Sequence, residues 1–221
     1  MNRQWGVIGN QGFEFIGKIN ASMSHEIKNT LAVINENAGL LEDFTLMADK
    51  GMPIDPERLK SLAGKIQQQI KRADKIVKNM NMFAHSTDKT LKQVKLDEIL
   101  DFVAALSARL ISNRGIVLEI VPNAEPVVIQ TNPFFLKNLI WLCIDFAMDW
   151  TGEKKTIAVS YKKVSGGAEI KLSKLDGFSN MPVDYFPQER EKAFLEALGG
   201  EMAICRKPGE ISIILPGTIE Q

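Results

Sequence analysis

The residues with the clearest chemical potential lie in one short segment, Ser24-His25-Glu26-Ile27-Lys28-Asn29-Thr30-Leu31. If this segment is helical, with about 100° of rotation per residue, Met23 and Ile27 lie on an apolar stripe. His25 then lies about 200° from each of them and faces solvent. An exposed imidazole can act as a nucleophile or accept a phosphoryl group. The spacing therefore predicts an accessible histidine on the outside of a helix.

Glu26 and Asn29 flank His25 in a way that could assist such chemistry. Glu26 is adjacent in the chain, and Asn29 follows one turn later on the same exposed face. A carboxylate can hold the ring N–H, which fixes the tautomer and makes the other nitrogen more nucleophilic. An amide one turn on can position a water molecule for hydrolysis. A solvated histidine beside a glutamate is also a common surface pair, so the chemical interpretation depends on the elements that hold these residues.

Two long helices joined by a short turn are expected to position this segment. The first spans about 12–48 and the second about 56–84, with Gly51 and Pro53 between them and Asp55 as an N-cap. Apolar residues recur in three- and four-residue steps along both helices: Ile16, Ile19, Met23, Ile27, Leu31, Ile34 and Leu41, then Leu59, Leu62, Ile66, Ile70, Ala73, Ile76, Val77, Met80 and Phe83. A lone hairpin cannot cover both broad apolar faces, so we expect a homodimer that forms a four-helix bundle.

The rest of the chain predicts an α+β domain. Residues 85–92 are polar and suit a linker, and the texture changes from Val94 onward. Helices are expected at 96–111, 133–150 and 187–198, and strands at 116–121, 127–130, 156–164, 168–174, 201–206 and 210–215. Helices on one face of a mixed or antiparallel sheet give an α/β sandwich. The expected organisation is an N-terminal tail (1–11), a helical hairpin (12–86) and this second domain (93–221).

The composition excludes several classes of function. The chain has 221 residues, of which 45% are hydrophobic and 24% charged, with 27 basic and 27 acidic side chains. This neutral balance favours neither nucleic acid nor an anionic membrane. Cys143 and Cys205 form no disulfide framework or metal-ligand spacing, which suits a reducing cytoplasm. We expect no secretory signal and no transmembrane helix, because charged and polar residues interrupt the most apolar window, 133–150.

The segment from Ser24 to Leu31 resembles the H-box of sensor histidine kinases, whose usual pattern is S-H-E/D-hydrophobic-R/K-N/T-P-L. Thr30 stands where the family commonly has proline, which suggests a straighter helix without removing chemistry. The resemblance covers nearly the whole chain. Residues 93–99 are similar to the start of the family's ATP-binding domain, residues 131–148 to its N-box helix, and residues 199–202 and 213–216 to its closing strands.

The nucleotide site that this resemblance implies is degenerate. Leu142 replaces the metal-coordinating asparagine of the N-box, and leucine cannot ligate Mg²⁺. The D-x-G-x-G box is reduced to Asp176-Gly177-Phe178-Ser179, with bulky Phe178 where a backbone approach is needed. Only 21 residues separate Gly177 from Gly199, and the helix expected at 187–198 takes most of them. No glycine run remains to cradle phosphates, so we expect no ATP binding.

The resemblance therefore implies a dimeric histidine phosphotransferase with a decayed ATPase domain. His25 would relay phosphoryl groups to and from receiver-domain aspartates, with Glu26 supporting His25 and Asn29 assisting attack by water. The receiver would supply the Mg²⁺, and this chain would bind no cofactor of its own. A hybrid sensor kinase is a further candidate partner.

Three alternatives remain open from the sequence. The chain could dephosphorylate receivers, using Glu26 and Asn29 more than His25. It could be a non-catalytic dimeric adaptor, or an ATP-dependent histidine kinase with an atypical site. Among other candidates, His85 suits a capping or linker role. Trp141, Trp150 and the pair at 134–135 suit the core, and Trp150 also suits an exposed contact.

Overall fold

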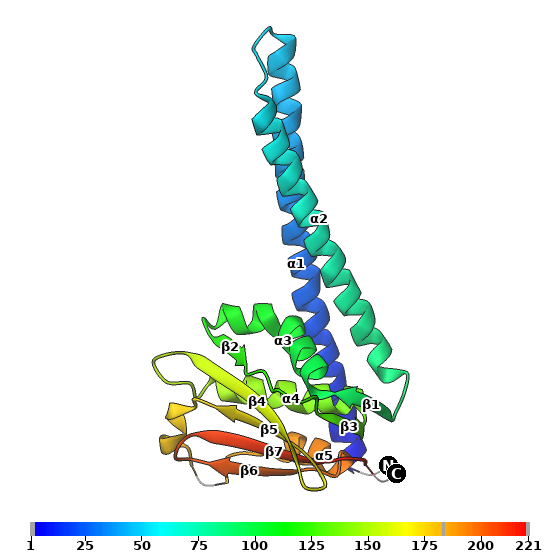
Figure 1. Cartoon of the computed structure of the whole chain (residues 1–221), viewed down its shortest axis with the longest axis vertical. Coiled ribbons are helices and arrows are strands. Elements are labelled where there is room, and N and C mark those ends of the chain that lie inside the picture. Colours follow the sequence, from blue (N-terminus) through cyan, green and yellow to red (C-terminus); the bar gives the residue numbers. More distant parts are fainter. Residues whose placement is uncertain (1–2, 183, 220–221) are drawn as a thin grey trace. The chain divides into compact units, whose positions relative to one another are not determined.

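The computed structural model describes residues 3–182 and 184–219. It divides into two compact units, of which the first is the hairpin Asn20–Ala84. The second combines the described parts of Met1–Ile19 and His85–Gln221. One helix, α1 (Arg3–Asp49), belongs to both units, since the division falls after Ile19 (Figure 1).

The hairpin unit consists of α1 from Asn20 onward and α2 (Pro56–Ala84), as the apolar periodicity predicts. Asp55 caps α2, because its Oδ1 accepts a hydrogen bond from the backbone N–H of Glu57 at 3.0 Å. Helix α1 continues without a break through Thr30, where a proline would disturb it. The Thr30 hydroxyl is buried and donates to the Glu26 carbonyl at 2.9 Å.

Burial within the hairpin is one-sided. Met23, Leu62, Ile76 and Phe83 are buried, and so are the polar residues Thr30 and Asn37 of α1. Other members of the expected apolar stripe stay exposed, namely Leu31 at 54%, Ile70 at 54% and Val77 at 39% of their surface. The described hairpin therefore presents an apolar face that no residue of its own covers.

The second unit has the predicted α+β architecture. It contains helices α3 (Leu96–Asn113), α4 (Pro133–Met148) and α5 (Glu189–Ala197), short 3-10 helices η1 (His85–Thr87) and η2 (Asp176–Asn180), and strands β1 (Lys92–Lys95), β2 (Val117–Ile120), β3 (Val128–Thr131), β4 (Thr156–Val164), β5 (Gly167–Ser173), β6 (Glu201–Cys205) and β7 (Glu210–Pro216). The five-stranded sheet has the order β2-β4-β5-β7-β6, and β1 pairs with β3 separately. Only the β2–β4 pair of the larger sheet is parallel.

The core of this unit lies between helix α4 and one face of the sheet. Buried residues alternate with partly exposed ones along β5, and the polar members of β5 form ion pairs on the opposite face, such as Glu169 with Lys162 at 2.8 Å. Helix α4 is buried at 13 of its 16 residues because it is apolar nearly all round. Its start is fixed by Pro133 and by Asn132, whose Oδ1 accepts from the backbone N–H groups of Phe134 and Phe135.

The expected N-terminal tail at 1–11 is wrong, because helix α1 already begins at Arg3. Met1 and Asn2 lie outside the described residues. Residues 3–19 are helical and belong to the same compact unit as α4, against which Trp5 and Phe15 pack their rings. Most other element boundaries agree with the sequence-based ones to within about two residues, the usual uncertainty of helix and strand ends.

Candidate functional site

The H-box residues lie on a single stretch of α1 in the hairpin unit. His25 and Asn29 are exposed, and Glu26 is half-buried. Met23 and Thr30 are buried on the other side of the helix. The structure thus confirms that the His25 side of the helix is exposed, as the helical spacing predicts.

This arrangement places three polar groups within about one turn of helix. Since an α-helix rises about 1.5 Å per residue, Asn29 lies about 6 Å along the axis from His25. Residues four apart share a face and can act on the same bound group. The Thr30 hydroxyl donates a hydrogen bond to the backbone carbonyl of Glu26. The side-chain carboxylate of Glu26 takes no part in this bond. The catalytic roles of His25, Glu26 and Asn29 stay predictions.

Aromatic rings pack together around the end of α4 and η2, where the sequence resemblance implies a nucleotide site. Phe146 of α4 stacks on Phe186 with ring centroids 3.8 Å apart and an interplanar angle of 8°. Phe178 of η2 is fully buried, 6.0 Å from the rings of both Phe146 and Trp150. The ring of Tyr185 is the fifth member, with its centroid 6.1 Å from that of Trp150. We call these five residues the aromatic cluster.

Leu142 lies one turn before Phe146 on α4 and is 2% exposed. A buried leucine next to packed rings offers no ligand to a metal ion. In the part of the chain that the structure describes, no group of three His, Cys, Asp or Glu side chains is arranged to hold a metal ion.

The remnants of the glycine box serve contacts within the protein. A Cβ on Gly177 would approach the Trp150 carbonyl oxygen to 2.9 Å, and the Gly177 N–H donates to that same oxygen at 3.0 Å. A Cβ on Gly152 would meet the Asp176 side chain. These glycines thus permit close packing between η2 and the segment after α4.

One open cavity of about 400 Å³ remains at this place. Gly152, Glu153, Lys154, Asp176 and Gly177 line it. Its lining holds two carboxylates and a single ammonium group, and the asparagine and glycine run of a nucleotide site are absent from it.

Sequence reasoning missed Lys137, a buried cation on α4. Lys137 is 6% exposed, and its Nζ lies 4.8 Å from the centroid of the Phe102 ring. Burial lowers the pKa of its ammonium group to about 8, with a further contribution from the positive charge of Lys92. The available signal in the sequence was a lysine within a mostly apolar helix.

The remaining candidate residues lie apart from the H-box. His85 is exposed in η1, where its Nδ1 lies 2.8 Å from Oδ2 of Asp88, an arrangement that suits a linker. Trp141 is buried, whereas Trp150 is half-buried in the aromatic cluster.

The hairpin matches a known family. Residues 16–89 match the His Kinase A (phospho-acceptor) domain. This match covers about a third of the chain and includes the segment of α1 that carries His25. The sequence matches no curated protein at a significant level.

Solved structures of histidine kinases are also similar to this chain. The Acinetobacter baumannii histidine kinase AdeS is 14% identical, with a TM-score of 0.48, over 87% of this chain and 97% of AdeS. The ATP-binding domain of PrrB from Mycobacterium tuberculosis is 19% identical, with a TM-score of 0.48, over 58% of this chain and 98% of that domain. Histidine kinase ThkA in complex with the response regulator TrrA is 20% identical, with a TM-score of 0.46, over 93% of this chain and 63% of that one.

None of the helices among the described residues is both long and apolar enough to span a membrane.

Proposed function

We propose that this chain is a histidine phosphotransferase of a two-component phosphorelay, which exchanges phosphoryl groups between His25 and receiver-domain aspartates without using ATP. The observation that carries the proposal is a contrast within one chain. His25 is exposed on a helix that matches a phospho-acceptor domain, while the region of the nucleotide site is filled by the aromatic cluster.

The transfer itself needs little from this chain beyond a well-placed imidazole. The lone pair of the unprotonated ring nitrogen of His25 attacks the phosphorus of an aspartyl phosphate, in line with the leaving carboxylate oxygen. The new N–P bond forms as the old P–O bond breaks, and the carboxylate leaves with its electron pair. Positive charge develops on the ring, and the Glu26 carboxylate stabilises it. The reverse step passes the phosphoryl group to a second receiver, and each receiver supplies its own Mg²⁺.

Three separate features support the proposed lack of ATP use. Leu142 removes a metal ligand, Phe178 is buried where backbone should meet phosphate, and Phe186 stacks on Phe146 beside them. Opening this region would require separating several packed rings, each of which contributes to the core. We therefore expect calorimetry with millimolar Mg·ATP to give no binding heat. Saturable binding at micromolar concentration would restore the atypical-kinase alternative.

A homodimer completes the proposal. The exposed apolar residues of the hairpin, among them Leu31, Ile70 and Val77, are of the type that a second hairpin covers in a four-helix bundle. A bundle of two hairpins would leave the His25 face of each α1 open to a receiver. We expect the chain to act in the cytoplasm, with receivers as partners.

Receiver dephosphorylation is the second candidate, because Asn29 is exposed on the face of α1 that carries His25. An amide in this position can orient water toward a phosphoryl group. The two candidates predict different fates for the phosphate, which lets one experiment separate them.

The test is transfer of radiolabel from receiver domains that have been phosphorylated with [³²P]acetyl phosphate. We expect acid-labile label on the wild-type chain and none on His25→Ala. The chain has two histidines, so His85→Ala is a matched control that should accept label like the wild type.

Other results would favour the alternatives. If His25→Ala speeds the loss of receiver phosphate as well as the wild type does, the phosphatase function is correct. If the wild type neither takes label nor changes the receiver, the chain is an adaptor.

A further inference from the structure

The first part of α1, residues 3–19, packs against the C-terminal domain through aromatic and apolar side chains. Phe15 is 1% exposed and stacks on Trp141 of α4, with ring centroids 6.2 Å apart and an interplanar angle of 21°. Trp5 lies 6.2 Å from Phe135 of α4, which in turn contacts Phe194 of α5. A helix that carries rings at these positions occupies the groove formed by α4 and α5.

The backbone of this segment comes close to α4. A Cβ on Gly12 would lie 3.2 Å from Cε1 of Phe134, tighter than ordinary side-chain contacts. Glycine at this position therefore lets the helix approach the groove.

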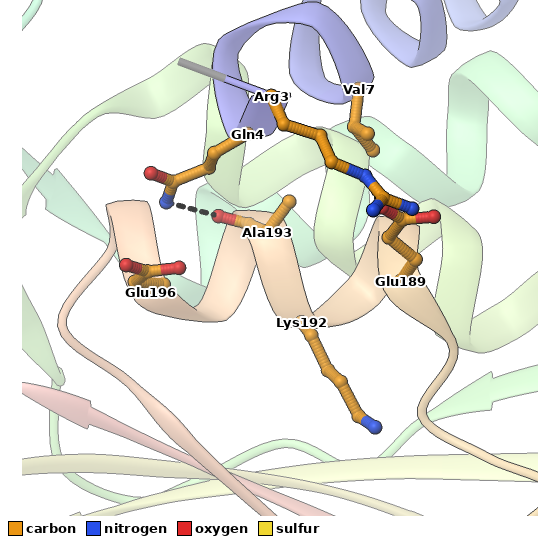
Figure 2. A pocket seen from close by; sticks show the side chains of 7 residues that line it. All are labelled: Arg3, Gln4, Val7, Glu189, Lys192, Ala193 and Glu196. Atoms are coloured by element: carbon orange, nitrogen blue, oxygen red, sulfur yellow. Dashed lines mark hydrogen bonds and ion pairs between the residues drawn. The ribbon is translucent and has the colours of Figure 1, made fainter.

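The outer end of the segment is held by polar contacts at the rim of an open cavity of about 410 Å³ (Figure 2). Nε2 of Gln4 donates to the Ala193 carbonyl at 3.4 Å, and Arg3 pairs with Glu189 at 2.8 Å. The Arg3 and Glu189 side chains are 86% and 59% exposed, so water and salt screen this pair. The segment is thus anchored firmly at Phe15 and weakly at Arg3.

The sequence of the segment weakens the helix that it forms. Glycine occupies positions 6, 9, 12 and 17, and each glycine makes a helix about fivefold less favourable than alanine does. At Gly6, Gly9 and Gly17 no atom lies within 4 Å of the position that a Cβ would take, so packing does not require glycine there. Short isolated helices are marginal even with good helix formers. The helix over 3–19 must therefore depend on its contacts with the groove.

We infer that the groove between α4 and α5 is a binding site for an amphipathic helix, and that residues 3–19 are its own occupant, a latch that becomes helical on docking and can detach. Docking ties the C-terminal domain to α1 in addition to the linker after Ala84. Detachment uncovers an aromatic surface formed by Phe134, Phe135 and Trp141. This property is independent of phosphotransfer at His25.

Hydrogen exchange of the full chain, followed by mass spectrometry, tests the latch. We expect Trp141→Ala to speed amide exchange across residues 3–17 at least tenfold while 30–49 stay unchanged. Trp150→Ala is the matched control, since Trp150 lies in the aromatic cluster and has no described contact with residues 3–19; it should leave exchange in 3–17 as in the wild type. Equal protection of 3–17 in Trp141→Ala and in the wild type would overturn the inference.

A second variant keeps the test valid if Trp141→Ala unfolds the domain. Gly6→Ala/Gly9→Ala/Gly17→Ala adds no contact to the groove and should slow exchange in 3–17 by roughly a hundredfold, because three glycines are replaced. Unchanged exchange in this variant would show that helix formation does not limit docking, and would contradict the inference. Neither measurement involves a receiver, so failure here is distinct from failure of the proposed function.

Discussion

In the hairpin unit Leu31, Ile70 and Val77 are exposed, whereas helix α4 of the other unit is buried at 13 of its 16 residues. The hairpin thus exposes apolar side chains to solvent, and its candidate phospho-acceptor, His25, is also exposed. In the C-terminal domain, the aromatic cluster occupies the region where the sequence resemblance implies a nucleotide site. Of the two units, the hairpin exposes apolar side chains of α1 and α2, and the domain buries those of α4.

The largest expected effect concerns the exposed apolar face of the hairpin. Leu31→Asp/Ile70→Lys should convert the proposed homodimer into a monomer, because both side chains would become charged inside a four-helix bundle. Sedimentation at micromolar concentration should give about twice the chain mass for the wild type and the single-chain mass for the variant. Asn35→Asp, at an exposed polar site of α1, is the control and should stay dimeric. A wild type that sediments as a stable monomer would contradict the bundle.

The next effect concerns the aromatic cluster. Phe178→Ala removes a fully buried ring and should lower the free energy of unfolding by about 3–5 kcal/mol, the usual cost of deleting a buried phenylalanine. Tyr185→Ala is the control, since Tyr185 is 46% exposed in the same cluster and should cost clearly less. Urea denaturation provides the measurement. Equal costs for the two variants would mean that the cluster is not a packed core.

These contrasts also show which features the sequence could predict. Local signals were enough for the strands around Gly166-Gly167 and for the start of α4 at Pro133, since turn and cap chemistry is encoded in neighbouring residues. His25 was placed correctly because helical periodicity alone decides which side of α1 it lies on.

Features that depend on distant residues were missed. The apolar spacing predicted a helix from about Gly12, whereas α1 begins at Arg3, because Trp5 and Phe15 gain contacts with α4, more than a hundred residues later. The contribution of Tyr185 and Phe186 to the aromatic cluster was equally invisible, since both pack on Phe146 from a loop. Tertiary contacts override local propensity at both places.

A smaller effect is expected from Lys137, the buried cation of helix α4. Its pKa is about 8 in the folded protein, below the value of 10.5 for an unburied lysine. Between these two pH values the unfolded chain holds a proton that the folded chain releases. The free energy of unfolding should therefore gain a contribution that rises from about pH 8 to about pH 10.5.

Lys137→Met tests this contribution, because methionine keeps the apolar stem without the charge. The variant should be more stable than the wild type at pH 7, and its advantage should shrink as the pH rises toward 10.5. Denaturant titrations at several pH values measure both. Lys163→Met, at an exposed position of β4, is the control for general charge effects. A constant difference between Lys137→Met and the wild type across this range would show that burial does not perturb the ammonium group.

The smallest effect on stability, and the most informative for chemistry, is expected from Glu26→Ala and Asn29→Ala. Asn29 is exposed and Glu26 is half-buried at the edge of the buried side of α1, so each change should alter the free energy of unfolding by no more than about 1 kcal/mol. Glu26→Ala should nevertheless slow phosphoryl transfer in both directions, because the His25 ring carries partial positive charge in the transition state that the two directions share. Asn29→Ala should accept label almost normally and hold it longer, if its amide orients the attacking water. Glu36→Ala and Asn35→Ala remove the same groups from exposed sites two to three turns later and should behave as the wild type. If Asn29→Ala and Asn35→Ala lose label at the same rate as the wild type, Asn29 does not contribute to hydrolysis of the phosphohistidine. The exposed face of α1 would then act in phosphoryl transfer and not in dephosphorylation.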